Sequence, residues 1–130
     1  AQVHALMPMM QFSVAPWRVL SKENAKYCLE AAKLHTKMGP YFLELAKQAS
    51  KTGEPIVKPM ALAFPNSSYE MIKDQFVLGN GIIVAPVVTK GALSRKVVLP
   101  KGKWQDDKGK IYRGNTVTYT NLTVPKSLAD

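Results

Sequence analysis

The sequence predicts an α+β protein, with a kinked helix or a helical hairpin in its first half and antiparallel β-structure in its second half. Over residues 22–51, apolar side chains recur at the i, i+3, i+4 spacing of a helix with one buried face. After Gly53 the pattern changes to short apolar runs separated by turns that contain glycine. We place the boundary between the two parts near residues 65–74.

The predicted helix has clear signals at its start, its middle and its end. Ser21 is a favourable N-cap, and Gly39-Pro40 interrupts the pattern because proline lacks an N–H and clashes with the preceding turn. Gly53 is suited to end the helix, with Pro55 just beyond it. The apolar stripe predicted to be buried consists of Ala25, Cys28, Leu29, Ala32 and His35, followed by Phe42, Leu45, Ala46 and Ala49.

The rest of the chain is predicted from shorter patterns. Residues 1–20 are apolar and irregular, Pro8 and Pro16 limit any helix there, and Ala5-Leu6-Met7 with Met9-Met10 suggest a buried segment. Gly79-Asn80-Gly81 indicates a tight turn between two strands, and lacks the third glycine and the following helix of a dinucleotide site. Strands are predicted at residues 56–57, 74–78, 82–88, 95–99, 111–112 and 116–120.

Composition limits the partners that we expect. The chain has 130 residues and a net charge of +9, but its basic residues are scattered, without a basic block interleaved with aromatics. We therefore predict a solvated lysine surface and no nucleic-acid partner. No apolar run approaches the length of a membrane helix, so no membrane partner is expected either. A single cysteine, Cys28, excludes an internal disulfide.

Residues able to carry catalysis are sparse. Cys28 and His35 are spaced to share one helix face, but two ligands do not close a zinc site, and we interpret them as a packed pair. A pair of convergent carboxylates is also missing, because no aspartate precedes Asp74 and Asp106-Asp107 falls in a hydrophilic turn. We predict no catalytic residue, no cofactor and no metal ligand in this chain.

Four ordered motifs give these observations a common explanation. The motifs are Pro40-Tyr41; residues 53–60 with Phe64-Pro65; residues 74–79 with 82–87; and residues 97–104, ending in Leu99-Pro100-Lys101-Gly102-Lys103-Trp104. Together they resemble the family 31 glycoside hydrolases, which are retaining α-glycosidases that include α-glucosidases, α-xylosidases and α-galactosidases. The resemblance covers about residues 1–125.

The resemblance implies a partial enzyme. Residues 1–65 would be the end of a catalytic (β/α)8 barrel, and residues 66–130 part of the proximal C-terminal β-sandwich. The family's two catalytic aspartates would lie upstream, so we expect the chain alone to be inactive and the intact enzyme to act on an oligosaccharide or glycoside. The start at Ala1, without an initiator Met, suggests a processed or excised product. The compartment stays open; the bacterial periplasm and the extracellular space both fit.

The resemblance also nominates substrate-binding residues. Gln11, Phe12 and Ser13 would line the sugar subsite, with Gln11 and Ser13 at positions where many members have Arg and His. This segment is closer to α-galactosidase-like members. Trp17 is a candidate stacking platform, whereas Lys58 replaces a family arginine and is expected to be structural. The alternative is a non-enzymatic carbohydrate-binding or scaffolding β-domain. An excised barrel end would also expose apolar helix faces, which favours self-association.

Overall fold

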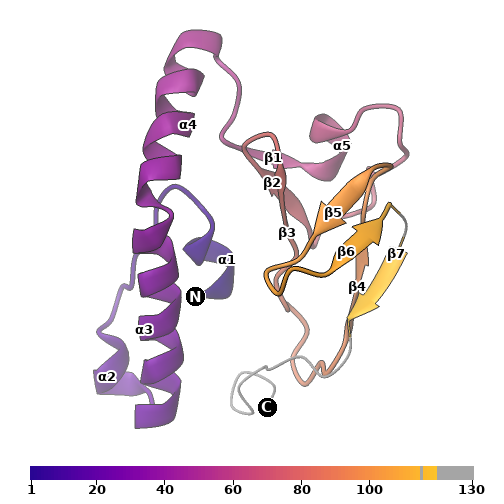
Figure 1. Cartoon of the computed structure of the whole chain (residues 1–130). Helices are drawn as coiled ribbons and strands as arrows, with labels where there is room; N and C mark the ends of the chain where they lie inside the picture. The colour runs from indigo at the N-terminus through magenta and orange to yellow at the C-terminus, as the bar shows by residue number, and fades with distance from the viewer. Residues whose placement is uncertain (115, 120–130) are drawn as a thin grey trace.

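The computed structural model describes residues 1–114 and 116–119, and shows a helical rod beside a β-rich part (Figure 1). The helices are α1 (Gln2–Ala5), α2 (Pro16–Val19), α3 (Lys22–Lys37), α4 (Gly39–Thr52) and α5 (Met60–Ala63). The strands are β1 (Val57–Pro59), β2 (Phe76–Leu78), β3 (Ile82–Val84), β4 (Arg95–Val98), β5 (Lys103–Gln105), β6 (Ile111–Arg113) and β7 (Thr116–Tyr119).

Helices α3 and α4 lie end to end as one interrupted rod, so the alternative of a helical hairpin is not confirmed (Figure 1). Met38 joins them with φ −81° and ψ −6°, close to helical values. The Met38 N–H donates to the Leu34 carbonyl and the Phe42 N–H to the Met38 carbonyl, each at 3.0 Å. Pro40 sits in the first turn of α4, where its missing N–H has no helical partner to lose.

Both ends of this rod form as predicted. The Asn24 N–H donates to Ser21 Oγ at 3.3 Å, which satisfies one of the free donors at the start of α3. Gly53 ends α4 with φ +74°, and its N–H donates to the Ala49 carbonyl at 2.8 Å. The left-handed conformation explains why a glycine occupies this position.

The described strands pair into three small antiparallel sheets. One has the order β1-β2-β3, and the others are the pairs β4-β7 and β5-β6. Residues 79–81 connect β2 to β3, with Leu78 opposite Ile82, which confirms the predicted turn. Antiparallel β-structure is thus confirmed, while the sandwich and the division at residues 65/66 stay predictions. β1 from the first predicted part pairs with β2 from the second.

Several predicted boundaries need correction. The third strand ends at Val84, not at 88, since Pro86 interrupts the run. Strand β5 and helix α5 were not predicted, and residues 1–20 contain the short helices α1 and α2. The last predicted strand is described as far as Tyr119, so its final residue, like residues 121–130, lies outside the described part.

The main core lies where α4 packs on the β2–β3 hairpin. Its buried members are Phe42, Leu45, Leu78 and Val84. The predicted buried stripe on α3 is wrong in this chain: no residue of α3 is buried, and Leu29 is 54% exposed. The segment at residues 5–10 is not buried as predicted either, because Ala5 is its one buried residue and Met9 is 73% exposed.

Candidate functional site

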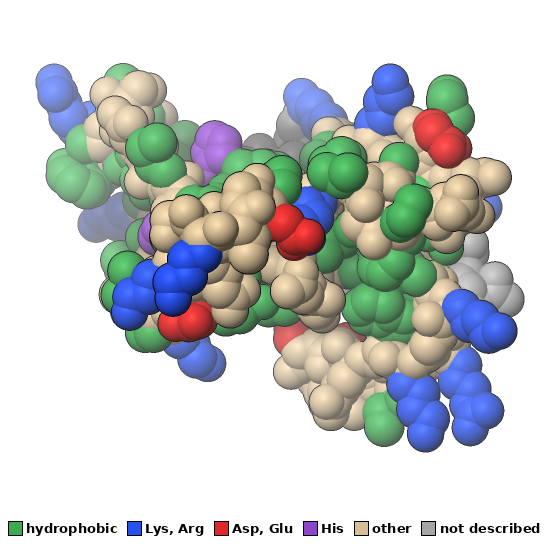
Figure 2. All heavy atoms as spheres, turned by 90° about the horizontal axis from the view of Figure 1, so that it is seen from above, with side chains coloured by type: hydrophobic (Ala, Val, Ile, Leu, Met, Phe, Trp, Pro, Cys, Tyr) green, Lys and Arg blue, Asp and Glu red, His purple; other side chains and the backbone are tan. Residues whose placement is uncertain are grey.

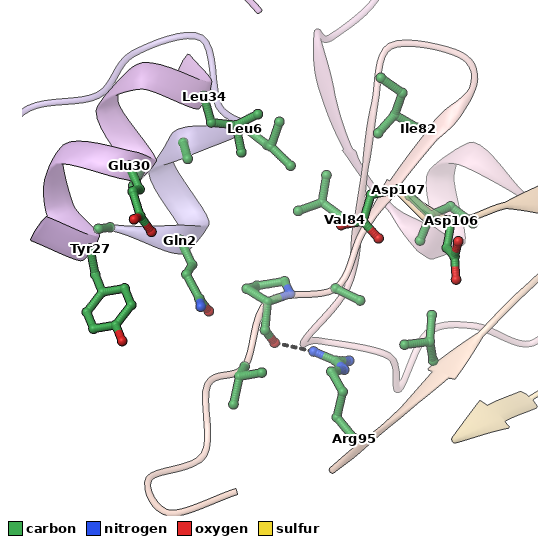
Figure 3. A pocket seen from close by; sticks show the side chains of 18 of the residues that line it. Gln2, Leu6, Tyr27, Glu30, Leu34, Ile82, Val84, Arg95, Asp106 and Asp107 are labelled. Atoms are coloured by element: carbon green, nitrogen blue, oxygen red, sulfur yellow. Dashed lines mark hydrogen bonds between the residues drawn. The ribbon is translucent and has the colours of Figure 1, made fainter. Parts of the chain in front are cut away.

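A cleft of about 1010 Å³ lies between the helices α1 and α3 and the β-rich part. Figure 3 shows Leu6 and Leu34 on the helical side facing Ile82 and Val84 of β3 across this space. The floor continues along the loop after β3 to Arg95 of β4. The cleft is thus walled mainly by apolar side chains, a composition typical of binding sites for small molecules or of unfilled interfaces.

Polar side chains stand at both rims of the cleft. Tyr27 and Glu30 project from α3 on one side, whereas Asp106 and Asp107 lie on the other side, just after β5 (Figure 3). Arg95 is the one cationic side chain among the described residues that line the cleft. On the face shown in Figure 2, Lys and Arg side chains are scattered and do not gather into a single basic patch.

Asp106 is held by its own turn. Its Oδ1 accepts the backbone N–H groups of Lys108 at 3.0 Å and Lys110 at 2.9 Å, while the Tyr112 hydroxyl donates to Oδ2 at 3.2 Å. Burial raises the pKa of Asp106, but these hydrogen bonds and the charge of Lys108 together bring the pKa below its ordinary value. A carboxylate so engaged stabilises the β5–β6 turn and is poorly placed to exchange protons with a substrate.

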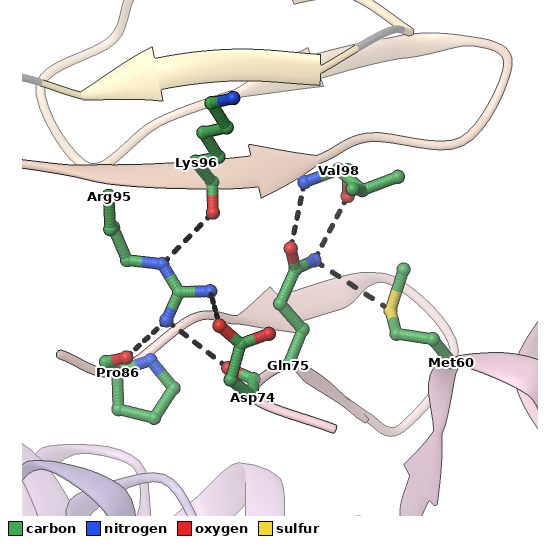
Figure 4. Close-up of polar contacts among 7 residues, drawn as sticks. All are labelled: Met60, Asp74, Gln75, Pro86, Arg95, Lys96 and Val98. Carbon is green, nitrogen blue, oxygen red and sulfur yellow. Dashed lines mark hydrogen bonds and ion pairs between the residues drawn. The ribbon is translucent and has the colours of Figure 1, made fainter. Parts of the chain in front are cut away.

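Arg95 ties three segments together at the end of the cleft (Figure 4). Its guanidinium lies 3.1 Å from the Asp74 carboxylate and donates to the backbone carbonyls of Asp74, Pro86 and Lys96. Its side chain is only 9% exposed, so these partners compensate for the loss of water around the charge. The group links β4 to the segments on either side of the β2–β3 hairpin.

Gln75 performs a similar linking function in the interior, at 4% exposure. Its Oε1 accepts a hydrogen bond from the Val98 N–H at 2.7 Å, and its Nε2 donates to the Val98 carbonyl at 3.0 Å (Figure 4). The side-chain amide thus binds both backbone groups of Val98, as a neighbouring strand would. Sequence reasoning missed this role. The available signal was a single amide at the start of an apolar strand, where an unpartnered polar group is costly.

The sequence-predicted substrate residues lie away from the cleft. Gln11, Phe12 and Ser13 are consecutive in the connection between α1 and α2, and all three are exposed. Trp17 follows on α2 and is 77% exposed. None of the four lines the cleft. The structure therefore brings them together in one accessible segment, and their contact with a sugar stays a prediction.

Metal ligands are not assembled in residues 1–114 and 116–119, which contain no group of three or more His, Cys, Asp or Glu side chains suited to a cation. Cys28 is half-buried. His35 places Nδ1 3.3 Å from the Ala5 carbonyl, and its ring centroid lies 5.0 Å from that of Phe42. Within the same residues, no helix is both long and apolar enough to cross a membrane.

Comparisons with known proteins give a consistent family assignment. The Glycosyl hydrolase family 31 C-terminal domain matches residues 53–129. The myogenesis-regulating glycosidase of Mus musculus is 37% identical over 124 residues, which are 95% of this chain and 17% of that protein. An α-glucosidase of Saccharolobus solfataricus is 34% identical over 106 residues, 80% of this chain and 15% of that protein.

Two further matches extend the comparison. The Flavobacterium johnsoniae GH31 dextranase complexed with glucose aligns with a TM-score of 0.74 and 34% identity, over 83% of this chain and 14% of that chain. The SITS-binding protein of Tetronarce californica is 25% identical over 123 residues, 89% of this chain and 17% of that protein. The chain thus spans less than a fifth of the length of these relatives.

Proposed function

Since the chain belongs to glycosyl hydrolase family 31, we propose that it is the C-terminal part of a retaining α-glycosidase, which hydrolyses terminal α-glucosidic or α-galactosidic bonds. The observation that carries this proposal is the family match over residues 53–129. The similarity to the mouse glycosidase extends it over nearly the whole chain. The chain covers only 17% of the length of the mouse glycosidase and 15% of that of the Saccharolobus solfataricus α-glucosidase, which supports the interpretation that it is one part of an enzyme.

Retention requires two carboxyl groups on opposite sides of the scissile bond, about 5 Å apart, one as nucleophile and one as acid and base. Two of the carboxylates here are already engaged, Asp106 by three hydrogen bonds and Asp74 by Arg95. We assign the nucleophile and the acid/base to aspartates upstream of Ala1. Residues 1–65 would complete the barrel, and residues 66–130 would begin the C-terminal β-sandwich.

This arrangement explains why large apolar side chains of the helical rod are exposed. In the complete enzyme, Leu29 and Leu34 on α3 would pack against other strands and helices of the barrel. Gln11 and Ser13 would hydrogen-bond sugar hydroxyls from the segment before α3, beside Phe12, and Trp17 would stack on a sugar face. In the isolated chain the same apolar surface would favour self-association, which gel filtration would show as a species larger than the monomer.

The test compares the isolated chain with the complete protein that contains it. We expect the complete protein to release nitrophenol from a nitrophenyl α-glucoside or α-galactoside with retention at the anomeric carbon, and the pure 130-residue chain to release none. In the complete protein, Gln11→Ala should lower kcat/KM about 5- to 10-fold, the loss of one hydrogen bond. The matched variant Val14→Ala should leave kcat/KM unchanged. Activity of the isolated chain would overturn the proposal.

A second candidate is a non-catalytic carbohydrate-binding or scaffolding β-domain. It is favoured by the engaged state of Asp74 and Asp106, which are held by Arg95 and by the β5–β6 turn. This candidate predicts retardation of the complete protein on immobilised oligosaccharide without bond cleavage. Hydrolysis by the complete protein would exclude it.

A further inference from the structure

We propose that Asn66 is an acceptor for N-linked glycosylation, a role independent of the proposed function. Asn66-Ser67-Ser68 fits the acceptor pattern of Asn, any residue except proline, then Ser or Thr. The pattern falls between α5 and β2, in the loop that precedes the buried Gln75. A glycan here would lie on the β-rich part of the chain, away from the predicted sugar-binding segment before α3.

The tip of this loop, residues 66–68, is exposed to solvent, whereas the residues on either side of the tip pack against each other. Asn66, Ser67 and Ser68 are all exposed, as a transferase requires of its acceptor. On either side of the tip, Phe64 and Tyr69 meet edge to face, with ring centroids 6.3 Å apart. Phe64 also packs against the Trp104 ring at 6.2 Å. A bulky substituent on Asn66 would therefore extend into solvent without disturbing the aromatic contacts beneath.

Backbone geometry explains one member of the pattern but not the other. Asn66 has φ +65°, a left-handed conformation that asparagine tolerates better than most residues. Ser68 has φ +57°, where glycine or asparagine would be less strained than serine. The turn thus accounts for an asparagine at 66 and gives no advantage to a serine at 68. The Ser68 hydroxyl is, however, the group that the acceptor pattern needs two residues after the asparagine.

The chemistry needs one co-reactant, an oligosaccharide attached through C1 to a lipid diphosphate. The Asn66 amide nitrogen, Nδ2, attacks C1 and forms the C–N bond. The C1–O bond to the diphosphate breaks, and its electron pair leaves with the lipid diphosphate. One proton passes from Nδ2 to a base of the transferase, and no oxidation or reduction occurs.

The test expresses the full chain behind a cleavable signal peptide in the secretory pathway of a eukaryotic cell. Site-resolved mass spectrometry should find a glycan on the peptide that contains Asn66, and peptide N-glycosidase should remove it and leave aspartate at that position. Ser68→Ala should abolish the modification, whereas Ser68→Thr should retain it. Ser67→Ala is the matched control because the middle position is unrestricted apart from proline, and it should leave the modification unchanged.

A second copy of the pattern, Asn121-Leu122-Thr123, lies outside the described residues and serves as an internal reference. Its modification would show that the chain reached the transferase. Once the signal peptide has been cleaved, an unmodified Asn66 overturns the proposal, and a glycan on Asn121 would show that the failure is specific to Asn66. A glycan on Asn66 that persists in Ser68→Ala would also overturn it, since the pattern would then not be the recognised feature.

Discussion

The two halves of the helical rod differ sharply in how much apolar surface they bury. On α4, Phe42 and Leu45 are 7% and 6% exposed, packed with Leu78 and Val84 of the β2–β3 hairpin. On α3, no residue is buried, and Leu29 is 54% exposed. Both helices carry apolar side chains at helical spacing, so the difference comes from the partner and not from the helix.

That contrast shows what a helical pattern specifies. An apolar stripe predicts a helix and the face that it will turn toward a partner, but not whether the partner belongs to the same chain. The α4 stripe meets a β-hairpin of this chain. Besides the contact of His35 with Phe42, the α3 stripe meets the short helices α1 and α2, whose own large side chains are mostly exposed, among them Trp17 at 77%. The uncovered stripe agrees with a chain that spans a small share of its relatives.

The largest effect is expected from one truncation made in both regions. Leu78→Ala removes a fully buried side chain from the core and should lower the free energy of unfolding by about 3 kcal/mol, through lost burial and a new cavity. Leu29→Ala makes the same truncation on α3 and should change it by less than about 0.5 kcal/mol. Urea denaturation followed by tryptophan fluorescence measures both. Equal effects would show that α3 is covered in solution and would break the comparison.

A second, smaller effect concerns the contact between α4 and the hairpin. Gly79 has φ +62°, and an added Cβ would meet Tyr41 Oη and Leu45 Cδ2, the latter at 2.9 Å. Gly79→Ala should therefore cost about 2 to 3 kcal/mol, the sum of backbone strain and overpacking.

Gly53→Ala is the matched control for that substitution. Gly53 has a similar φ of +74°, but nothing lies within 4 Å of an added Cβ. It should cost about 1 kcal/mol, from backbone strain alone. The difference between the two variants measures how tightly α4 packs on the hairpin. If both lose equal stability in urea denaturation, the packing is looser than the structure shows.

Local rules predicted much of the fold. The N-cap at Ser21, the interruption at Gly39-Pro40, the end at Gly53 and the turn at residues 79–81 all depend on residues close in sequence, and all are confirmed. The family motifs likewise lie in short segments, and the family match confirms what they indicate.

Features that depend on distant contacts could not be predicted. Gln75 binds Val98, which is 23 residues away, and Arg95 binds Asp74, which is 21 residues away. The cleft forms between α3 and β3, whose relative placement no local pattern encodes. Burial of α3 was predicted wrongly for the same reason, because a stripe does not reveal its partner.

The smallest effect is a pH dependence that belongs to the β-rich part alone. The folded state lowers the pKa of Asp106, since the N–H groups of Lys110 and Lys108 and the Tyr112 hydroxyl outweigh the effect of burial. The unfolded carboxylate, with a pKa of about 3.9, therefore binds protons first as the pH falls. The stability that Asp106 contributes is complete well above about pH 4 and is lost as the pH falls through the lower, folded pKa.

Asp106→Asn should therefore flatten the fall in the midpoint of thermal unfolding between about pH 5 and about pH 2, while lowering that midpoint slightly near neutrality. Asp107→Asn removes an equal charge from the adjacent exposed residue, whose carboxylate receives no hydrogen bond from the described part of the chain. The unfolding midpoint of Asp107→Asn should therefore fall more between about pH 5 and about pH 2 than that of Asp106→Asn. A steeper fall in Asp106→Asn than in the parent would reverse the sign of the argument. Because Asp106 acts within the β5–β6 turn, the exposed fraction of α3 should not change with either variant.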